Sequence, residues 1–145
     1  MPFPEPTPGL VIRYSYLWRR EYLEGSEEGR KDRPCAIVAS VRNQAGAPHV
    51  LVLPVTHTPP DWDTAAIEIP EFVKKRIGMD RERSWIVISE YNDFVWPGPD
   101  LRPAPGDEGG AIAYGTLPAS LFEQVRRAWL ALATKRRSSP VRRTD

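Results

Sequence analysis

Large apolar side chains recur at every second position near the start of the chain. Residues 10–18 read LVIRYSYLW, and within them Arg13 and Ser15 interrupt the apolar and aromatic residues. Because the side chains of a β-strand repeat every two residues, this segment is predicted to be a strand with one aromatic face. Prolines at positions 2, 4, 6 and 8 predict an extended N-terminal arm over residues 1–8.

Two short and almost wholly apolar runs come next and are predicted to be paired central strands. They are Cys35–Val41 (CAIVASV) and Val50–Val55 (VLVLPV), and the NQAGAP segment between them has the composition of a turn. Before them, residues 19–33 contain ten charged residues out of fifteen, which predicts a mobile surface loop.

The rest of the chain divides into short strands, a loop and two helices. The clearest helical period covers residues 118–134, where apolar residues form a stripe at helical spacing. Residues 97–110 are rich in proline, glycine and aspartate and are predicted to be a loop. Further strands are predicted at Ala66–Ile69, Ser84–Ser89 and Ala111–Thr116, and a short helix at Pro70–Ile77.

This pattern predicts one domain that is mainly β. Five or six short strands and one long terminal helix are typical of a small antiparallel barrel or strongly bent sheet with a helix packed against it. A length of 145 residues suits a single hydrophobic core, which we place at residues 9–134. Residues 135–145 contain five basic residues and one acidic residue and are predicted to be a disordered basic tail.

Charge and cysteine content narrow the function classes. The formal net charge is +1, to which the tail contributes +4 and residues 1–134 contribute −3. An acidic body argues against tight non-specific binding to nucleic acid and predicts that any RNA is held in a small groove. Cys35 is the only cysteine and the sequence shows no metal-type cluster, so we expect neither an internal disulfide nor a bound metal.

The chain shows no targeting or membrane-spanning pattern. Its first residues, MPFPEPTPG, have neither a basic start nor an apolar middle. Its apolar runs are far shorter than the roughly 20 residues that a bilayer requires. We therefore expect a soluble, cytoplasmic protein that does not enter a membrane.

Three short motifs around the predicted central strands carry the functional information. A GSE segment at 25–27 lies in the charged loop, Arg33-Pro34 opens one apolar strand, and Pro54-Val55-Thr56 closes the next. Together with Pro8-Gly9, they resemble motifs of the MazF/PemK family of toxin ribonucleases, over roughly residues 8–134. The resemblance implies an SH3-like antiparallel β-barrel, a homodimer, and cleavage of single-stranded RNA without a metal, cofactor or ribosome. It also implies a cognate antitoxin protein that blocks the RNA groove.

The resemblance assigns the chemistry to the ends of the central strands. Metal-free RNA cleavage needs a base for the 2′-hydroxyl, positive charge beside the phosphorane and a proton donor for the leaving oxygen. Arg33 matches the family's basic residue, although pairing with Asp32 or Glu28 is the alternative for an arginine in such a loop. Thr56 also matches, and its hydroxyl can bond a phosphate oxygen or orient Arg33. His57 departs from the family pattern but is the natural acid or base at neutral pH.

Other positions differ from the family. Val87 and Ser89 lie where some members carry an arginine and an acid, so a second catalytic pair is missing. The aromatic residues of segment 90–96 either stack on RNA bases or pack a loop against the barrel, and both interpretations stay open. The RNA-binding candidates are Ser26, Glu90, Tyr91, Asn92 and Trp96.

A second hypothesis is a non-catalytic SH3-like barrel that binds a protein or RNA through the charged loop and the aromatic segment. The presence of both Arg33 and Thr56 at family spacing favours the enzyme, because maintenance of the fold does not require them. A small gene for an acidic-tailed antitoxin directly beside this one would separate the two hypotheses.

Overall fold

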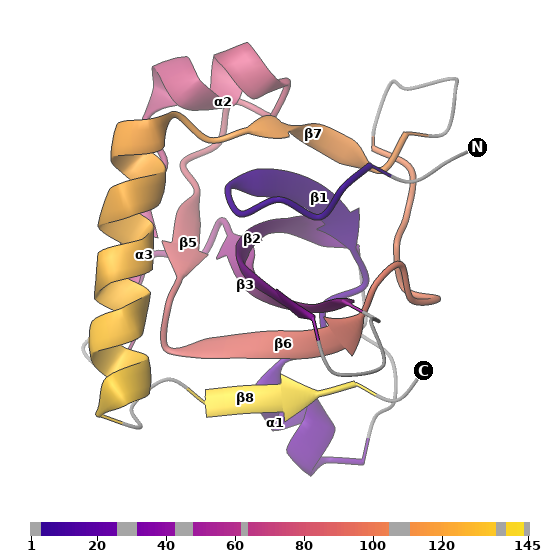
Figure 1. Ribbon diagram of the computed structural model, residues 1–145. Coiled ribbons are helices and arrows are strands. Elements are labelled where there is room, and N and C mark those ends of the chain that lie inside the picture. Colours follow the sequence, from indigo (N-terminus) through magenta and orange to yellow (C-terminus); the bar gives the residue numbers. More distant parts are fainter. Residues whose placement is uncertain are drawn as a thin grey trace.

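A computed structural model of the chain describes residues 4–25, 32–42, 48–61, 64–104, 111–135 and 139–143. Within these residues the chain forms a strongly bent β-sheet with helices at its margins (Figure 1). The strands are β1 (Leu10–Tyr14), β2 (Arg33–Arg42), β3 (Pro48–Thr56), β4 (Ala66–Glu68), β5 (Trp85–Val87), β6 (Glu90–Val95), β7 (Ala113–Thr116) and β8 (Ser139–Arg142). The helices are α1 (Arg19–Leu23), α2 (Glu71–Ile77) and α3 (Ala119–Thr134).

The strands form one sheet in which β3 has a central position. The order β4-β5-β3-β2-β1-β7 is antiparallel throughout, and β6 pairs with β3 on one side and with β8, in parallel, on the other. One edge of β3 is shared, since residues 49–52 pair with β6 and residues 55–56 pair with β5. This division bends the sheet, which is not closed among the described strands. The prediction of a mainly β protein with an antiparallel sheet and a C-terminal helix is confirmed.

The central strands are buried on both faces, which explains their continuous apolar runs. On β2, Ala36 and Val38 belong to a hydrophobic cluster that includes residues of α2 and α3. Cys35 and Ile37 point to the opposite face, where a second cluster contains aromatic residues such as Phe94. Figure 1 shows α3 running along one side of the sheet, where it covers the first cluster. None of the helices that the structure describes is long and apolar enough to cross a membrane.

The structure corrects the predicted boundaries around the first strand. β1 ends at Tyr14 rather than Trp18, because the Tyr16 N–H turns back to donate to the Tyr14 carbonyl (3.0 Å). The segment predicted as a surface loop begins with helix α1, whose Glu21 is buried. Residues 26–31 of that loop, and the predicted turn at 43–47, lie outside the described residues.

The prediction of a disordered tail is wrong for residues 139–143. Ser139–Arg142 form β8, and the following Arg143 is only 6% exposed. The Arg143 guanidinium pairs with Asp100 (Nη2 to Oδ2, 3.0 Å) and donates from Nη1 to Tyr14 Oη, the Ser15 carbonyl and Asn92 Oδ1. A buried arginine is tolerated here because its donors have protein acceptors.

Candidate functional site

A cleft of about 700 Å³ lies where the ends of the central strands meet the segment after α2. The three residues predicted to carry the chemistry, Arg33, Thr56 and His57, all line this cleft. They come from the start of β2 and the end of β3, with His57 directly after β3. The fold therefore brings the predicted catalytic residues to one cavity.

The strand register explains why Arg33 lies beside Thr56. The β2–β3 ladder ends where Cys35 is opposite Pro54, so Arg33 and Thr56 follow on from the same end of this strand pair. Arg33 is held there by pairing with β1, and Thr56 by pairing with β5. The Arg33 guanidinium donates from Nη1 to the Val55 carbonyl (3.3 Å), which fixes the side chain against the end of β3. Backbone pairing on a rigid sheet thus positions both residues.

Among the residues that the structure describes, no carboxylate forms an ion pair with the Arg33 guanidinium. Its central carbon lies 4.8 Å from the centre of the Trp18 ring, a cation–π contact. Its Nε is buried and has no hydrogen-bond partner within the described part of the chain. Burial is the main cause that lowers the pKa of Arg33, although an arginine stays charged at neutral pH. Arg33 is only partly buried and lines the cleft, so its guanidinium can bind an anion there.

Two further arginines line the same cleft. Arg13 of β1 donates from Nη1 to the Tyr114 hydroxyl (3.2 Å), and Arg20 of α1 lies 5.9 Å from the Trp18 ring centre. Sequence analysis did not select these residues. The polar Arg13 within an apolar strand was the available signal, but only the fold shows that it shares a cavity with Arg33.

Thr56 lies in a short side-chain turn at the end of β3. Its Oγ1 accepts a hydrogen bond from the Thr58 N–H (3.1 Å), which fixes the hydroxyl oxygen. A hydroxyl that accepts one bond can still donate its own proton. Thr56 can therefore donate to an oxygen of a ligand in the cleft.

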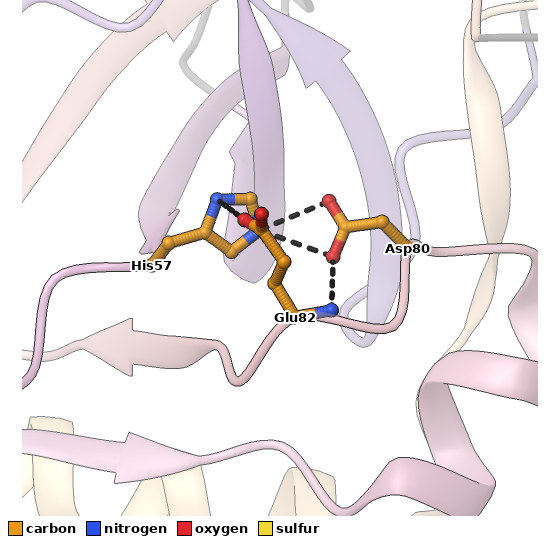
Figure 2. A group of neighbouring side chains, drawn as sticks. All are labelled: His57, Asp80 and Glu82. Carbon is orange, nitrogen blue, oxygen red and sulfur yellow. Dashed lines mark hydrogen bonds and ion pairs between the residues drawn. The ribbon is translucent and has the colours of Figure 1, made fainter.

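His57 lies between two carboxylates at the exposed edge of the cleft (Figure 2). Its Nε2 is 2.9 Å from an Asp80 oxygen, and its Nδ1 is 3.1 Å from a Glu82 oxygen. Both ring nitrogens are thus engaged in this arrangement. To act as a base on a ligand, the imidazole has to leave one of the two carboxylates.

Two of the four described RNA-binding candidates have their polar groups bonded within the protein. The Asn92 side chain is fully buried, and its amide bonds both the N–H and the carbonyl of Leu17. Glu90 accepts from the Tyr16 hydroxyl (3.1 Å) and the Arg19 N–H (2.8 Å), and burial raises the pKa of this carboxyl. The interpretation of Asn92 as an RNA contact is wrong, because a fully buried amide cannot reach RNA.

The aromatic candidates also lie outside the cleft lining. Tyr91 packs edge-to-face on Trp129 of α3, with ring centres 5.3 Å apart. Trp96 packs near Phe94 against the second hydrophobic cluster. These contacts match the packing interpretation of segment 90–96. Ser26 lies outside the described residues.

Comparisons of the chain with protein-family models, with curated proteins and with solved structures found no match. The functional argument therefore depends on the motifs of the sequence and on the chemistry of the cleft. Three arginines line the cavity together with three aspartates, Asp32, Asp61 and Asp80, so a negatively charged ligand is favoured beside the arginines and not throughout the cavity.

Proposed function

We propose that this protein is a cytoplasmic endoribonuclease toxin of the MazF/PemK type, with an SH3-like barrel, and that it cleaves single-stranded RNA in the cleft. The observation that carries the proposal is that Arg33 and Thr56 line one cavity. The Arg33 side chain is only partly buried, so a phosphate oxygen in the cleft can bond the accessible part of its guanidinium. Arginine suits the role because its planar guanidinium binds two phosphate oxygens at once.

The proposed reaction is attack of a ribose 2′-oxygen on the adjacent phosphorus. The new bond forms as the bond to the 5′-oxygen of the next nucleotide breaks, which gives a 2′,3′-cyclic phosphate, and the leaving 5′-oxygen takes a proton from water in the open cleft to become a 5′-hydroxyl. Arg33 stabilises the charge that builds up on the non-bridging oxygens, and Thr56 donates a hydrogen bond to one of them. Removal of one such donor typically lowers turnover by about 10²–10³-fold.

The proposed base is His57. It is the only imidazole in the cleft lining, and removal of the 2′-hydroxyl proton at neutral pH suits this group. Val87 also lines the cleft, at a position where some family members have a charged residue. The missing charge leaves His57 as the best-suited proton acceptor once its ring leaves Asp80.

The proposal includes two protein partners. A second copy of the chain forms the homodimer that the family resemblance implies, and a cognate antitoxin covers the cleft. An antitoxin segment that enters the cleft needs an acidic group for Arg33 and its neighbours, because those arginines present the positive charge of the cavity.

RNA cleavage by the purified protein tests the proposal. Wild type, Arg33→Ala and Arg33→Lys are incubated with single-stranded RNA in the presence of a chelator, and the new ends are analysed for cyclic phosphate. We expect cleavage by the wild type and a loss of about 10²-fold or more in both variants, since lysine cannot form the bidentate contact. Arg83→Ala is the matched control, because Arg83 is exposed, pairs with Glu68 and lies outside the cleft lining.

Intact RNA with the wild type at a concentration that binds RNA would refute the enzyme and favour the non-catalytic barrel. The structural observation behind this second candidate is that Asp80 and Glu82 occupy both nitrogens of His57. A binding module of this kind retains RNA or protein binding in Thr56→Ala, whereas the ribonuclease loses cleavage in that variant.

A further inference from the structure

We propose that His57, Asp80 and Glu82 form a binding site for one divalent transition-metal ion at the mouth of the cleft. The sequence offered no metal-type cluster, because these residues belong to separate segments: His57 follows β3, and the two acids follow α2. The fold brings one ligand atom from each side chain to within 4.8 Å of the others (Figure 2). This inference goes beyond the proposed RNA cleavage, which requires no metal.

The distances suit an ion. Metal bonds to imidazole nitrogen and carboxylate oxygen are about 2.0–2.2 Å long, so neighbouring ligand atoms lie roughly 3 Å apart around the ion. In the structure His57 Nε2 lies 2.9 Å from Asp80 and His57 Nδ1 lies 3.1 Å from Glu82, so the two carboxylates approach different ring nitrogens. One ion binds only one of these nitrogens, and one ligand atom from each side chain already lies within 4.8 Å of the others. Because all three side chains are exposed, rotation of Glu82 toward Asp80 is enough to place the three groups around one ion.

The backbone between Asp80 and Glu82 is held in a turn by a local hydrogen bond. Asp80 Oδ1 accepts a hydrogen bond from the Glu82 backbone N–H (3.1 Å), which forms a local turn and points both carboxylates toward His57. Ligand binding therefore requires little ordering of the backbone, and little conformational entropy is lost on binding.

The ligand types select the ion. One imidazole with two carboxylates suits borderline ions such as Zn²⁺, Co²⁺ and Mn²⁺, whereas Mg²⁺ and Ca²⁺ prefer an all-oxygen set. The two carboxylates together with a neutral imidazole cancel the charge of a divalent ion. The ion also leaves open coordination positions for water, because the site faces solvent.

Isothermal titration calorimetry with Zn²⁺ tests the site on the full-length, tag-free protein after chelator treatment. We expect one ion per chain for the wild type, and affinity weakened about tenfold or more in His57→Ala and Asp80→Asn. His49→Ala is the matched control, because His49 is the only other histidine and its Nδ1 also contacts a carboxylate, Asp93 (3.1 Å). Mg²⁺ is titrated in parallel and is expected to bind far more weakly.

A spectroscopic measurement identifies the ligand directly. The protein has two histidines, so an imidazole ¹H–¹⁵N spectrum contains two sets of ring signals. Zn²⁺ is expected to shift the signals of His57 and leave those of His49 unchanged. Equal Zn²⁺ affinity in the wild type and His57→Ala, no binding by the wild type, or a shift at His49 alone would each overturn the proposal. These readouts do not depend on RNA cleavage, so failure of the proposed function leaves the metal site testable.

Discussion

Trp18 links two of the arginines that give the cleft its charge. Its ring lies 4.8 Å from the Arg33 guanidinium and 5.9 Å from that of Arg20. A cation–π contact contributes about 0.5–2 kcal/mol, depending on how far the pair is removed from water. Trp18 thus helps to position Arg33 for contact with the proposed RNA substrate.

We therefore expect Trp18→Ala to lower kcat/KM for RNA cleavage by roughly tenfold, and Trp18→Phe to lower it less, because phenylalanine keeps an aromatic face. Cleavage kinetics on one RNA oligonucleotide would measure both effects. Thermal melting of the variants controls for loss of fold. Equal activity of the wild type and Trp18→Ala at unchanged stability would show that the ring does not position Arg33.

Glu90 gives a pH dependence of stability. Burial is the largest cause that raises its pKa, and it outweighs the hydrogen bonds from Tyr16 and Arg19 that oppose the rise. Because the carboxyl is harder to ionise in the folded protein than in the unfolded chain, its ionisation destabilises the fold above the folded-state pKa. This cost disappears as the pH falls below the ordinary glutamate pKa of about 4.3.

Glu90→Gln is therefore expected to raise the free energy of unfolding at neutral pH and to lose this advantage in acid. Urea denaturation at several pH values measures it. Glu68→Gln is the control of opposite sign, since a hydrogen bond from Arg83 lowers the pKa of Glu68. A wild type that is more stable than Glu90→Gln at neutral pH would contradict the assignment.

At the scale of the elements, β8 pairs with β6, and a buried arginine directly after it anchors this end of the chain. Arg143 follows β8 and pairs with Asp100 while it donates to three further acceptors near β1 and β6. Figure 1 shows β8 beside β6, with α1 next to it. Loss of Arg143 leaves a buried carboxylate without its cation and loosens the contacts among these segments.

We expect Arg143→Ala to lower the free energy of unfolding by about 3–5 kcal/mol, the usual cost of breaking one side of a buried ion pair. Arg142→Ala is a close control, because the Arg142 side chain is 83% exposed and lies 3.8 Å from Asp93. That variant should cost less than about 1 kcal/mol. Equal effects in chemical denaturation would show that the buried pair does not fasten β8.

Strands β6 and β8 were not predicted from the sequence. The central strands and α3 were predictable because their apolar residues recur regularly. β6 was missed since one of its buried residues is Asn92, whose amide is satisfied by the Leu17 backbone. β8 was missed because Val141 is its only buried apolar residue, and its burial depends on pairing with β6. Polar residues that are buried because they bond to other parts of the fold do not add to the apolar periodicity from which strands are predicted.

Some residues of the candidate site could be predicted from the sequence, and others could be found only from the fold. Arg33 and Thr56 were predictable from short motifs, because each motif lies within one segment of the chain. Arg13 and Tyr114 could not be selected, since their meeting depends on how β1 and β7 pair. The contact between His57 and Asp80 likewise depends on the return of the chain after α2.

For the whole molecule, the distribution of charge bears on how the proposed RNA substrate would be held. The net charge of +1 combines an acidic body with a basic C-terminus, and two of the five basic residues of that terminus lie near carboxylates of the body. Arg143 is buried against Asp100, and Arg142 lies near Asp93. In the cleft itself, the positive charge comes from three arginines, Arg13, Arg20 and Arg33.

This arrangement predicts a shallow salt dependence of RNA binding. Each phosphate contact on a single strand contributes about −0.7 to the slope of log K against log salt, so three arginines give a slope of about −2. Fluorescence anisotropy with a 2′-O-methylated RNA, which cannot be cleaved, measures the slope over a range of salt concentrations. Arg33→Ala is expected to make the slope shallower by about 0.7, whereas Arg83→Ala leaves it unchanged. A slope steeper than about −4 in the wild type would mean that RNA contacts basic residues well beyond the cleft, and that the defined groove inferred from the acidic body is wrong.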